Sequence, residues 1–274
     1  MASTVATKQR PSTRAGLRTV AVLYVGILVA VPLALIFART FEQGASTFWE
    51  AISTPDAVHA FRLTAEIALI AVVINTVFGI GVALLLARYR FPGRRLFNIL
   101  LDIPVSVSPI VVGLALVLVY GPTQGWFGPT LSDAGLQIIF ALPGMVLATC
   151  FVSLPLVVRE LVPVLEEEGL DQEIAARSLG ANGWQRFVRI TLPTVRWALA
   201  YGVVLSLARA IGEFGAVRVV SGDVIGQTQT GTLRVADLAE QGEPGSYQVA
   251  LVLVLFAVVC IVGISLLRPR EKKS

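Results

Sequence analysis

Four long apolar runs dominate this chain and constrain its fold more than any other feature. They cover residues 19–38, 67–87, 134–158 and 244–267, and each is free of charged residues. A helix needs about 20 apolar residues to cross the hydrocarbon core of a bilayer, and every run reaches that length. Of the 274 residues, 55% are hydrophobic and 15% are charged, with a mean hydropathy of +0.77. Soluble domains carry about 25% charged residues, so the sequence predicts an all-α bundle embedded in a membrane.

Two weaker segments complete the predicted set of spans. The uncharged stretch 103–132 is too long for one helix, and its second half is rich in Gly and Pro, which indicates a loop. The stretch 197–220 is apolar except for Arg209, Glu213 and Arg218. We therefore expect six transmembrane helices, over about residues 19–38, 67–87, 103–120, 137–158, 197–220 and 246–267.

The basic residues are distributed unevenly between the predicted loops. With six helices, most of them share one side of the membrane with both ends of the chain; these are Lys8, Arg10, Arg14, Arg18, Arg88, Arg90, Arg94, Arg95, Arg159, Arg177, Arg186, Arg189, Arg196, Arg268, Arg270, Lys272 and Lys273. The opposite side receives Arg39, Arg62, Arg218 and Arg234. Loops rich in Lys and Arg stay in the cytoplasm. The pattern therefore predicts cytoplasmic tails at 1–18 and 269–274, a membrane domain over 19–268, and a cytoplasmic loop at 159–196.

The first apolar run also has some character of a secretory signal, because basic residues precede it. Its 20 residues exceed the roughly 7–15 of a usual signal sequence. A cleavage motif of small residues does not follow Ala38, since Arg39 comes next. We therefore expect an uncleaved first membrane helix.

Several other functions are disfavoured by the sequence. Cys150 and Cys260 lie within apolar runs without C-x-x-C spacing, and His59 is the only histidine, so we predict no metal site. A basic stripe for nucleic acid is missing. The sequence also lacks a P-loop and a G-x-S-x-G motif, so we expect no catalytic residues and no ATP hydrolysis by this chain.

The polar segment 159–196 predicts two short helices. The first is expected over 172–179, with Asp171 capping its first turn and Gly180 ending it. Asn182 is placed to cap a second helix that starts near residue 183. A compact helix at the base of the membrane predicts a projection that fits a groove on a soluble partner.

The same segment resembles the cytoplasmic EAA loop of importer-type ABC transporter permeases. The resemblance depends on the spacing A-A-x3-G-x9-I-x-L-P, which is formed by Ala175, Ala176, Gly180, Ile190, Leu192 and Pro193. Pro193 is expected to turn the chain back into the membrane. The family usually has Glu directly before the two alanines, whereas Ile174 takes that position here and Glu173 precedes it. The resemblance implies that these residues, with Glu173, couple the chain to an ATPase; an ordinary linker is the alternative.

The likeness extends over about residues 60–265. Residues 100–120, 141–165 and 196–222, including the run ARAIGEFGAVRVVSG, resemble the sulfate and molybdate branch of these permeases, most closely the CysW type of sulfate permease subunit. This resemblance implies a type I ABC importer permease fold in a bacterial inner membrane. It also implies a heterodimer with a homologous permease subunit, two copies of a subunit that binds ATP and Mg, and an external sulfate-binding protein. Thiosulfate, molybdate and tungstate remain alternative or additional substrates.

A charged pair is predicted within the bundle. Arg209 and Glu213 are four residues apart, which places them on one face of a helix. Each costs about 3 kcal/mol if it faces lipid at mid-bilayer, so both are expected to face the interior. The pair is interpreted either as part of the anion path or its gate, or as a structural ion pair. Other polar residues predicted at depth, open to the same two interpretations, are Asn75, Ser106 and Ser108.

An ion-gradient-driven carrier is the competing class. Such carriers favour internal inverted repeats and a buried proton or sodium site. The sequence shows no clear repeat, and the plausible deep acid, Glu213, has Arg209 as its expected partner. The ABC importer permease is therefore the preferred hypothesis.

Overall fold

Helices make up all the regular structure of the computed structural model, which describes residues 11–243 and 245–267. This confirms the predicted all-α class. In chain order the elements are α1 (Pro11–Phe41), α2 (Ala45–Ser53), α3 (Pro55–Arg88), α4 (Arg94–Ser106), α5 (Pro109–Tyr120), α6 (Gly128–Asp133), α7 (Leu142–Glu168), α8 (Asp171–Ser178), α9 (Gly183–Arg186), the π-helical turn η1 (Phe187–Thr191), α10 (Leu192–Ile211), α11 (Gly215–Ser221), α12 (Gly231–Glu240) and α13 (Gly245–Leu267).

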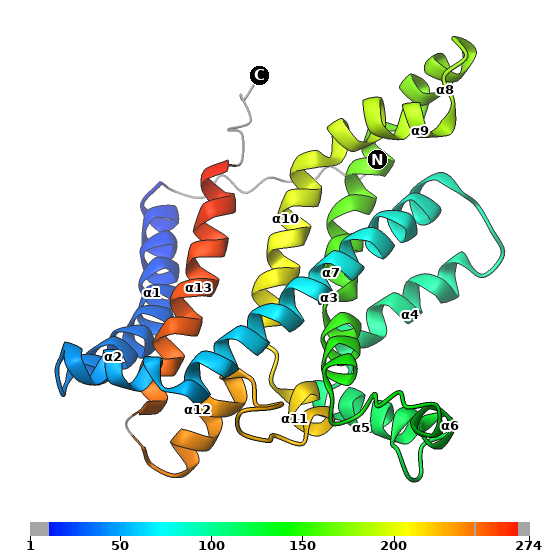
Figure 1. Cartoon of the computed structure of the whole chain (residues 1–274). Coiled ribbons are helices and arrows are strands. Elements are labelled where there is room, and N and C mark those ends of the chain that lie inside the picture. Colours follow the sequence, from blue (N-terminus) through cyan, green and yellow to red (C-terminus); the bar gives the residue numbers. More distant parts are fainter. Residues whose placement is uncertain (1–10, 244, 268–274) are drawn as a thin grey trace.

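The long helices form an elongated bundle. Five helical stretches in the described part of the chain are long and apolar enough to cross a membrane, and the bent pair α4–α5 provides a sixth if it counts as one span. α1, α13, α10 and α7 stand upright, and α3 crosses in front of them diagonally (Figure 1). The loop that carries α8 and α9 projects from one end, here called the loop end. α2, α6, α11 and α12 gather at the opposite end, here called the cap end (Figure 1).

Three buried apolar clusters of the described residues hold the bundle together, the smallest of which is formed by Ala68, Ala210 and Ile211. The cluster toward the cap end includes Leu63, Met145 and Val217, from α3, α7 and α11. The cluster toward the loop end includes Leu86 and Val195, from α3 and α10, together with residues of α7. The outer surface is different, because most described side chains of α1 are exposed although they are apolar. Lipid is the solvent in which such a surface is stable.

The predicted third span departs from a single straight helix. We expected one helix over 103–120, but the structure has α4 and α5, bent by 111° at a short break. Pro109 explains the break, because proline disfavours helical conformation in the residue before it, and Ser108 is extended with φ −57° and ψ 133°. Pro109 then begins α5 at a position where its missing N–H is tolerated.

The predicted fifth span ends earlier than expected. The segment 197–220 was predicted as one helix, but α10 ends at Ile211 and α11 begins at Gly215. The carboxylate of Glu213 accepts a hydrogen bond from the backbone N–H of Ala216 at 3.0 Å. A side chain that caps a new helix in this way competes with continuation of the old one.

Most of the other predicted boundaries shift outward, whereas the fourth span, predicted from about residue 137, begins later, at Leu142 of α7. α1 and α3 begin before the apolar runs at 19–38 and 67–87, and α7 extends to Glu168. The polar segment is therefore helical at both of its ends. Its non-helical parts lie at residues 169–170 and 179–182. The predicted tail residues 1–10 and 269–274 lie outside the described residues.

Candidate coupling site

Helix α8 forms where the sequence predicts it, but its cap differs. We expected Asp171 at the N-cap, whereas Leu170 occupies that position and Asp171 is the first helical residue. Asp171 and Glu173 both lie in the first turn, where negative charge is favourable near the positive end of the helix dipole. The error concerns one residue and leaves the predicted electrostatic role unchanged.

Gly180 ends α8 as predicted. Its φ of 87° lies in the left-handed region, and its N–H donates to the carbonyl of Arg177 at 3.0 Å. The N–H of Ala181 donates to the carbonyl of Ala176, also at 3.0 Å. These two bonds form a Schellman motif, which satisfies the last carbonyls of the helix.

Asn182 caps the next helix as predicted. Its side-chain oxygen accepts from the N–H of Gln185 at 2.8 Å, and the Gln185 side chain accepts from the N–H of Asn182 at 2.9 Å. This reciprocal pair is a capping box. The helix does not stop before the membrane, however, because α9, η1 and α10 form one helical stretch from Gly183 to Ile211.

Pro193 therefore does not turn the chain, contrary to our expectation. It lies in the first turn of α10, directly after the π-helical turn 187–191. The N–H of Leu192 donates to the carbonyl of Phe187, five residues earlier. The hydrogen-bond ladder thus changes from π to α spacing beside Pro193, where the missing N–H of proline is accommodated.

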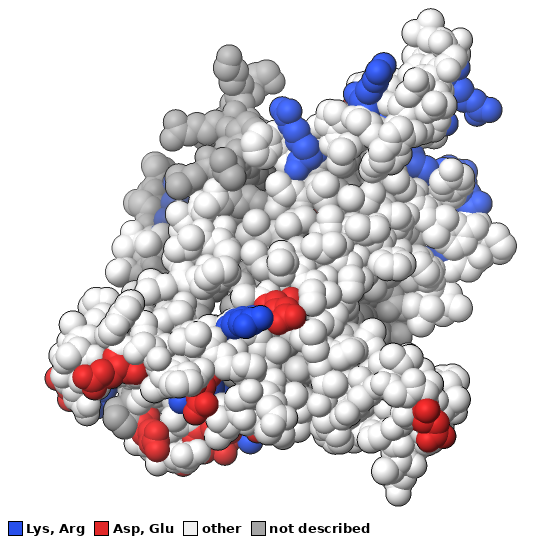
Figure 2. Space-filling view, viewed as in Figure 1, with Lys and Arg blue, Asp and Glu red and all other residues white. Residues whose placement is uncertain are grey.

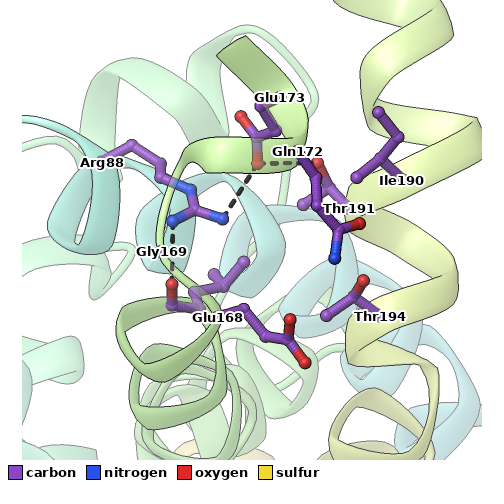
Figure 3. A pocket seen from close by; sticks show the side chains of 9 residues that line it. Arg88, Glu168, Gly169, Gln172, Glu173, Ile190, Thr191 and Thr194 are labelled. Carbon is purple, nitrogen blue, oxygen red and sulfur yellow. Dashed lines mark hydrogen bonds and ion pairs between the residues drawn. The ribbon is translucent and has the colours of Figure 1, made fainter. Parts of the chain in front are cut away.

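Glu173 points from α8 toward the bundle and contacts the end of α3. Its Oε1 lies 2.9 Å from Nη2 of Arg88 and accepts a hydrogen bond from the Thr191 hydroxyl at 3.1 Å. Arg88 also donates from Nη1 to the carbonyl of Leu165 at 2.8 Å. Figure 3 shows Arg88 directed at Glu173 across a small pocket between the helices. Glu173 is therefore a partly buried anchor between α8 and α3, with 16% of its side chain exposed.

The loop exposes three large apolar side chains, although exposed polar residues such as Arg177 lie between them in the sequence. Ile174, Leu179 and Trp184 are 57%, 89% and 72% exposed. Ala175, Gly180 and Pro193 are also exposed, while Ala176, Ile190 and Leu192 are partly buried. Ile174, which takes the position of the usual Glu of the motif, is one of these three exposed apolar side chains. We call Ile174, Leu179 and Trp184 the apolar knob.

The predicted charged pair is in contact. Nη1 of Arg209 lies 2.7 Å from Oε2 of Glu213, and their side chains are 36% and 2% exposed. Helical spacing suggested the contact, but Glu213 lies beyond the end of α10. Its backbone carbonyl also accepts a hydrogen bond from the Thr232 hydroxyl at 2.7 Å. The pair thus joins the end of α10 to the start of α11 and to α12.

The three other predicted polar residues lie in two different settings. Asn75 is 1% exposed and donates from Nδ2 to the carbonyl of Cys150 at 3.0 Å and to the Ser153 hydroxyl at 2.8 Å. It therefore links α3 to α7. Ser106 and Ser108 are exposed at the α4–α5 bend, and the Ser106 hydroxyl donates to the carbonyl of Asp102 at 3.1 Å.

Sequence reasoning missed Arg88 and Thr191 as site residues. Arg88 was counted as one basic residue among many, and Thr191 was read as part of a motif spacer. Arg88 and Glu173 are separated by 85 positions, so no periodicity connects them. The sequence offered one signal for this contact. Arg88 directly follows the apolar run 67–87, and the predicted short helix far along the chain carries an acid, Glu173.

Charge is also segregated along the bundle. On the face shown in Figure 2, Lys and Arg side chains gather toward the loop end, and most Asp and Glu side chains lie toward the cap end. At the cap end, Arg218 approaches Glu240 at 3.5 Å and Asp237 at 3.9 Å. A bundle with membrane-length helices, an apolar outer surface and opposite charge at its two ends is a multi-pass membrane protein.

The chain belongs to the family of binding-protein-dependent transport system inner membrane components, whose profile matches residues 76–273. It is 47% identical over 256 residues to the sulfate transport system permease protein CysW of Synechococcus elongatus, covering 93% of this chain and 89% of the relative. It is 48% identical to CysW of Escherichia coli, covering 92% and 86%. It is also 34% identical to the sulfate transport system permease protein CysT of the same organism, covering 90% of each chain.

Solved structures agree with the fold. A bacterial ABC transporter for import of the acidic polysaccharide alginate superposes with a TM-score of 0.74 over 93% of each chain, at 18% identity. The same kind of transporter in complex with a periplasmic protein bound to alginate pentasaccharide superposes with a TM-score of 0.70 at 19% identity, again over 93% of each chain. These similarities show that the chain shares the fold of a chain of a solved bacterial ABC importer.

Proposed function

We propose that this chain is the transmembrane permease subunit of an ATP-driven importer of sulfate. The observation that carries the proposal is the combination of a projecting apolar knob with close similarity to sulfate permeases. The relatives described above are sulfate transport permease proteins, and the two CysW proteins among them are 47% and 48% identical to this chain. The chain itself contributes a path through the membrane, not a catalytic step.

ATP hydrolysis then takes place on a separate subunit, which binds ATP and Mg. The apolar knob supports this assignment, because Leu179 is 89% exposed at the tip of a helix–turn–helix projection. Large exposed apolar groups on a projection mark a surface that a protein partner covers. Two copies of the ATPase serve the two permease subunits of one transporter.

A homologous permease subunit completes the membrane portion. Escherichia coli has both a CysW and a CysT sulfate permease protein, and this chain is 48% identical to the first and 34% to the second. That pattern supports a heterodimer of one chain of each type. A sulfate-binding protein delivers the anion from outside, as suggested by the alginate transporter that was solved with a periplasmic protein.

The loop end faces the cytoplasm in this proposal, together with both termini. The support is the excess of Lys and Arg in the loops on that side. The membrane is the inner membrane of a bacterium, by analogy with the named bacterial relatives. The cap end, where acidic residues gather, then meets the binding protein (Figure 2).

Arg209 is the candidate anion contact on the path. Its side chain is 36% exposed, so part of the guanidinium is accessible, whereas the paired Glu213 is 2% exposed. An Arg whose charge is partly compensated attracts a dianion without holding it tightly, which suits transit. Ser106 and Ser108 are further candidates, since both are exposed at the α4–α5 bend. Asn75 is buried, and its hydrogen bonds to α7 make it a link between α3 and α7.

The proposal is tested by reconstitution into liposomes. The chain is combined with its homologous subunit and the ATPase, and sulfate-loaded binding protein is added on the side of the cap end. ATP-dependent accumulation of radiolabelled sulfate is expected, and molybdate with its own binding protein gives no comparable uptake. Accumulation of sulfate against a gradient by this chain alone would contradict the importer and favour an ion-gradient carrier.

The docking surface is tested separately with Leu179→Gln. This variant places a polar amide on the tip of the knob, and we expect the ATPase to be lost on co-purification. Leu136→Gln is the matched control, because Leu136 is also exposed, at 58%, but lies in the segment before α7 at the cap end. Retention of the ATPase by Leu179→Gln would rule out the knob as the docking surface.

A further inference from the structure

We infer that Arg88 and Glu173 form the link through which movement of α8 reaches the membrane helices. Both act as positioning residues, since they hold helices rather than contact the anion. The inference rests on the proposed function, because α8 is displaced only if an ATPase drives it. Glu173, the acid that lies one position before the usual Glu of the motif, thus has a role within this chain.

Helix α8 has few connections to the rest of the bundle. It is preceded by Gly169 with φ 67° and followed by Gly180 with φ 87°, so left-handed glycines flank it. In the described part of the chain, the hydrogen bonds that join α8 to other long helices all use Oε1 of Glu173. Among the side-chain contacts of α8, this carboxylate is therefore the one through which a displacement of α8 acts on α3 and on the start of α10.

Arg88 distributes the contact over several helices. It is the last residue of α3, and its Nη1 donates to the carbonyl of Leu165, one of the last four carbonyls of α7. Those terminal carbonyls have no partner within their own helix, so the guanidinium satisfies one of them. Through Nη2 the same guanidinium holds Glu173, which in turn accepts from Thr191 before α10. One ion pair thus joins α3, α7, α8 and the start of α10 (Figure 3).

Burial makes this pair stiffer than an ordinary surface ion pair. The side chains of Arg88 and Glu173 are 11% and 16% exposed, so salt and water screen their attraction weakly. The planar guanidinium binds two acceptors at fixed geometry, which a lysine ammonium does not reproduce. The neighbouring pair Arg94–Glu166 has a similar distance of 2.8 Å, but its side chains are 35% and 49% exposed and it joins α4 to α7 without α8.

The linked helices continue to the candidate path. Leu86 of α3, Val157 of α7 and Val195 of α10 belong to one buried cluster next to the ion pair. α10 begins next to Thr191 and carries Arg209 near its other end.

The test compares assembled transporter complexes carrying Glu173→Gln or Arg88→Gln with the wild type. Three quantities are measured: co-purified ATPase, ATP hydrolysis with sulfate-loaded binding protein, and sulfate imported per ATP. We expect the ATPase to stay bound while sulfate per ATP falls about tenfold, a typical size for coupling between sites. Arg88→Lys keeps the positive charge but loses the planar guanidinium that binds two acceptors, so sulfate imported per ATP should be intermediate between the wild type and Arg88→Gln.

Arg94→Gln and Glu166→Gln serve as matched controls and should keep the wild-type ratio. An unchanged ratio in Glu173→Gln would overturn the inference while leaving the proposed function intact. Release of the ATPase by Glu173→Gln would also overturn it, because Glu173 would then act in docking. Failure of the wild-type complex to import sulfate would instead contradict the proposed function.

Thr191→Val provides a second measurement if Arg88→Gln does not assemble. It removes only the hydroxyl that donates to Glu173, at a residue that is 5% exposed. The loss of one such hydrogen bond is expected to lower sulfate per ATP about threefold. A ratio equal to the wild type in Thr191→Val and Glu173→Gln together would overturn the inference.

Discussion

The coupling loop and the α10–α11 junction each contain a carboxylate that contacts an arginine, but the two carboxylates are held in different ways. Glu173 of the loop contacts Arg88 and Thr191, which are 85 and 18 positions away. Glu213 of the junction contacts the side chain of Arg209 and the backbone of Ala216, which are four and three positions away. The two carboxylates thus use similar chemistry over very different sequence distances.

The contacts of Glu213 are local in the sequence, whereas those of Glu173 are tertiary contacts between separate helices. The junction carboxylate is more deeply buried, with 2% of the Glu213 side chain exposed against 16% for Glu173. Its side-chain partners come from the same turn of chain, so the junction is fixed as soon as that turn forms. The loop carboxylate finds its partners only when α3, α7 and α10 are already packed. A site that depends on several helices senses their relative positions, whereas a local site does not.

The largest expected effect comes from breaking the junction pair. Arg209→Gln leaves the Glu213 carboxylate buried without a cation, which we expect to lower the free energy of unfolding by about 3 kcal/mol. The midpoint of unfolding by denaturing detergent measures the loss.

The double variant Arg209→Gln/Glu213→Gln is the control for that prediction. Its neutral amides remove the uncompensated charge, and the Gln oxygen still accepts from the N–H of Ala216. Most of the stability should return. Equal losses in the single and double variants would show that the charge is not the cause.

Backbone strain at the loop gives the next largest effect. Gly180 has φ 87°, and alanine at this conformation costs about 1–2 kcal/mol. A Cβ there would meet no heavy atom of the described residues within 4 Å, so conformation rather than crowding is the cause. We expect proteolysis within residues 171–182 to accelerate roughly tenfold, because 1.4 kcal/mol corresponds to a factor of ten.

Gly135→Ala tests whether that effect is local. Gly135 at the cap end has φ 78° and the same open surroundings, so its backbone strain is comparable. Cleavage within 171–182 should keep its wild-type rate in this variant. A faster rate would show that strain spreads from one end of the bundle to the other.

The sequence was sufficient to predict features that depend on neighbours along the chain. Long apolar runs predicted membrane helices. Gly180 predicted the end of α8, and Asn182 predicted the start of α9. The spacing of Arg209 and Glu213 predicted their contact. Each of these rests on helix geometry or on burial of apolar surface, which are properties of a short window. The contact forms even though α10 ends at Ile211, before Glu213, because a spacing of four residues still places the two side chains close together.

Features that depend on packing were not predictable in the same way. The break at Pro109 was visible as a proline, but the 111° angle between α4 and α5 reflects what each helix packs against. The partners of Glu173 come from α3 and η1, and no spacing connects them. Pro193 was expected to redirect the chain. Instead, the π-helical residues before it change the hydrogen-bond spacing, so the helix continues although Pro193 has no N–H. These errors arise where tertiary contacts decide between locally acceptable conformations.

A smaller effect is expected from the cap of α9. Asn182→Ala removes the side-chain oxygen that accepts from the N–H of Gln185, while the backbone N–H of residue 182 can still donate to the Gln185 side chain; the loss costs about 1 kcal/mol. Amide exchange of Gln185 should then accelerate about fivefold, since that N–H donates to Asn182 at 2.8 Å. Ser178→Ala, which removes a hydroxyl bonded to the carbonyl of Ile174 at 3.2 Å, should leave the exchange unchanged.

The smallest expected effect is on stability and comes from Asp223, in the segment after α11. Partial burial and then the nearby charge of Asp237 raise the pKa of Asp223 above its usual value, while Gln229 and Arg218 oppose the shift. A carboxyl with a raised folded pKa contributes stability that is present below its unfolded pKa and is lost as the pH rises through the folded pKa. Partial exposure screens the effect, which keeps it small.

Asp223→Asn removes that titration while keeping the shape of the side chain. Asn also tolerates the left-handed backbone at this position, where φ is 52°. We expect the variant to melt at a higher temperature than the wild type at about pH 7, with the difference shrinking toward about pH 4, near the ordinary pKa of Asp. A difference that is the same at both pH values would mean that lost hydrogen bonds, and not ionisation of Asp223, control the stability of this part of the cap end.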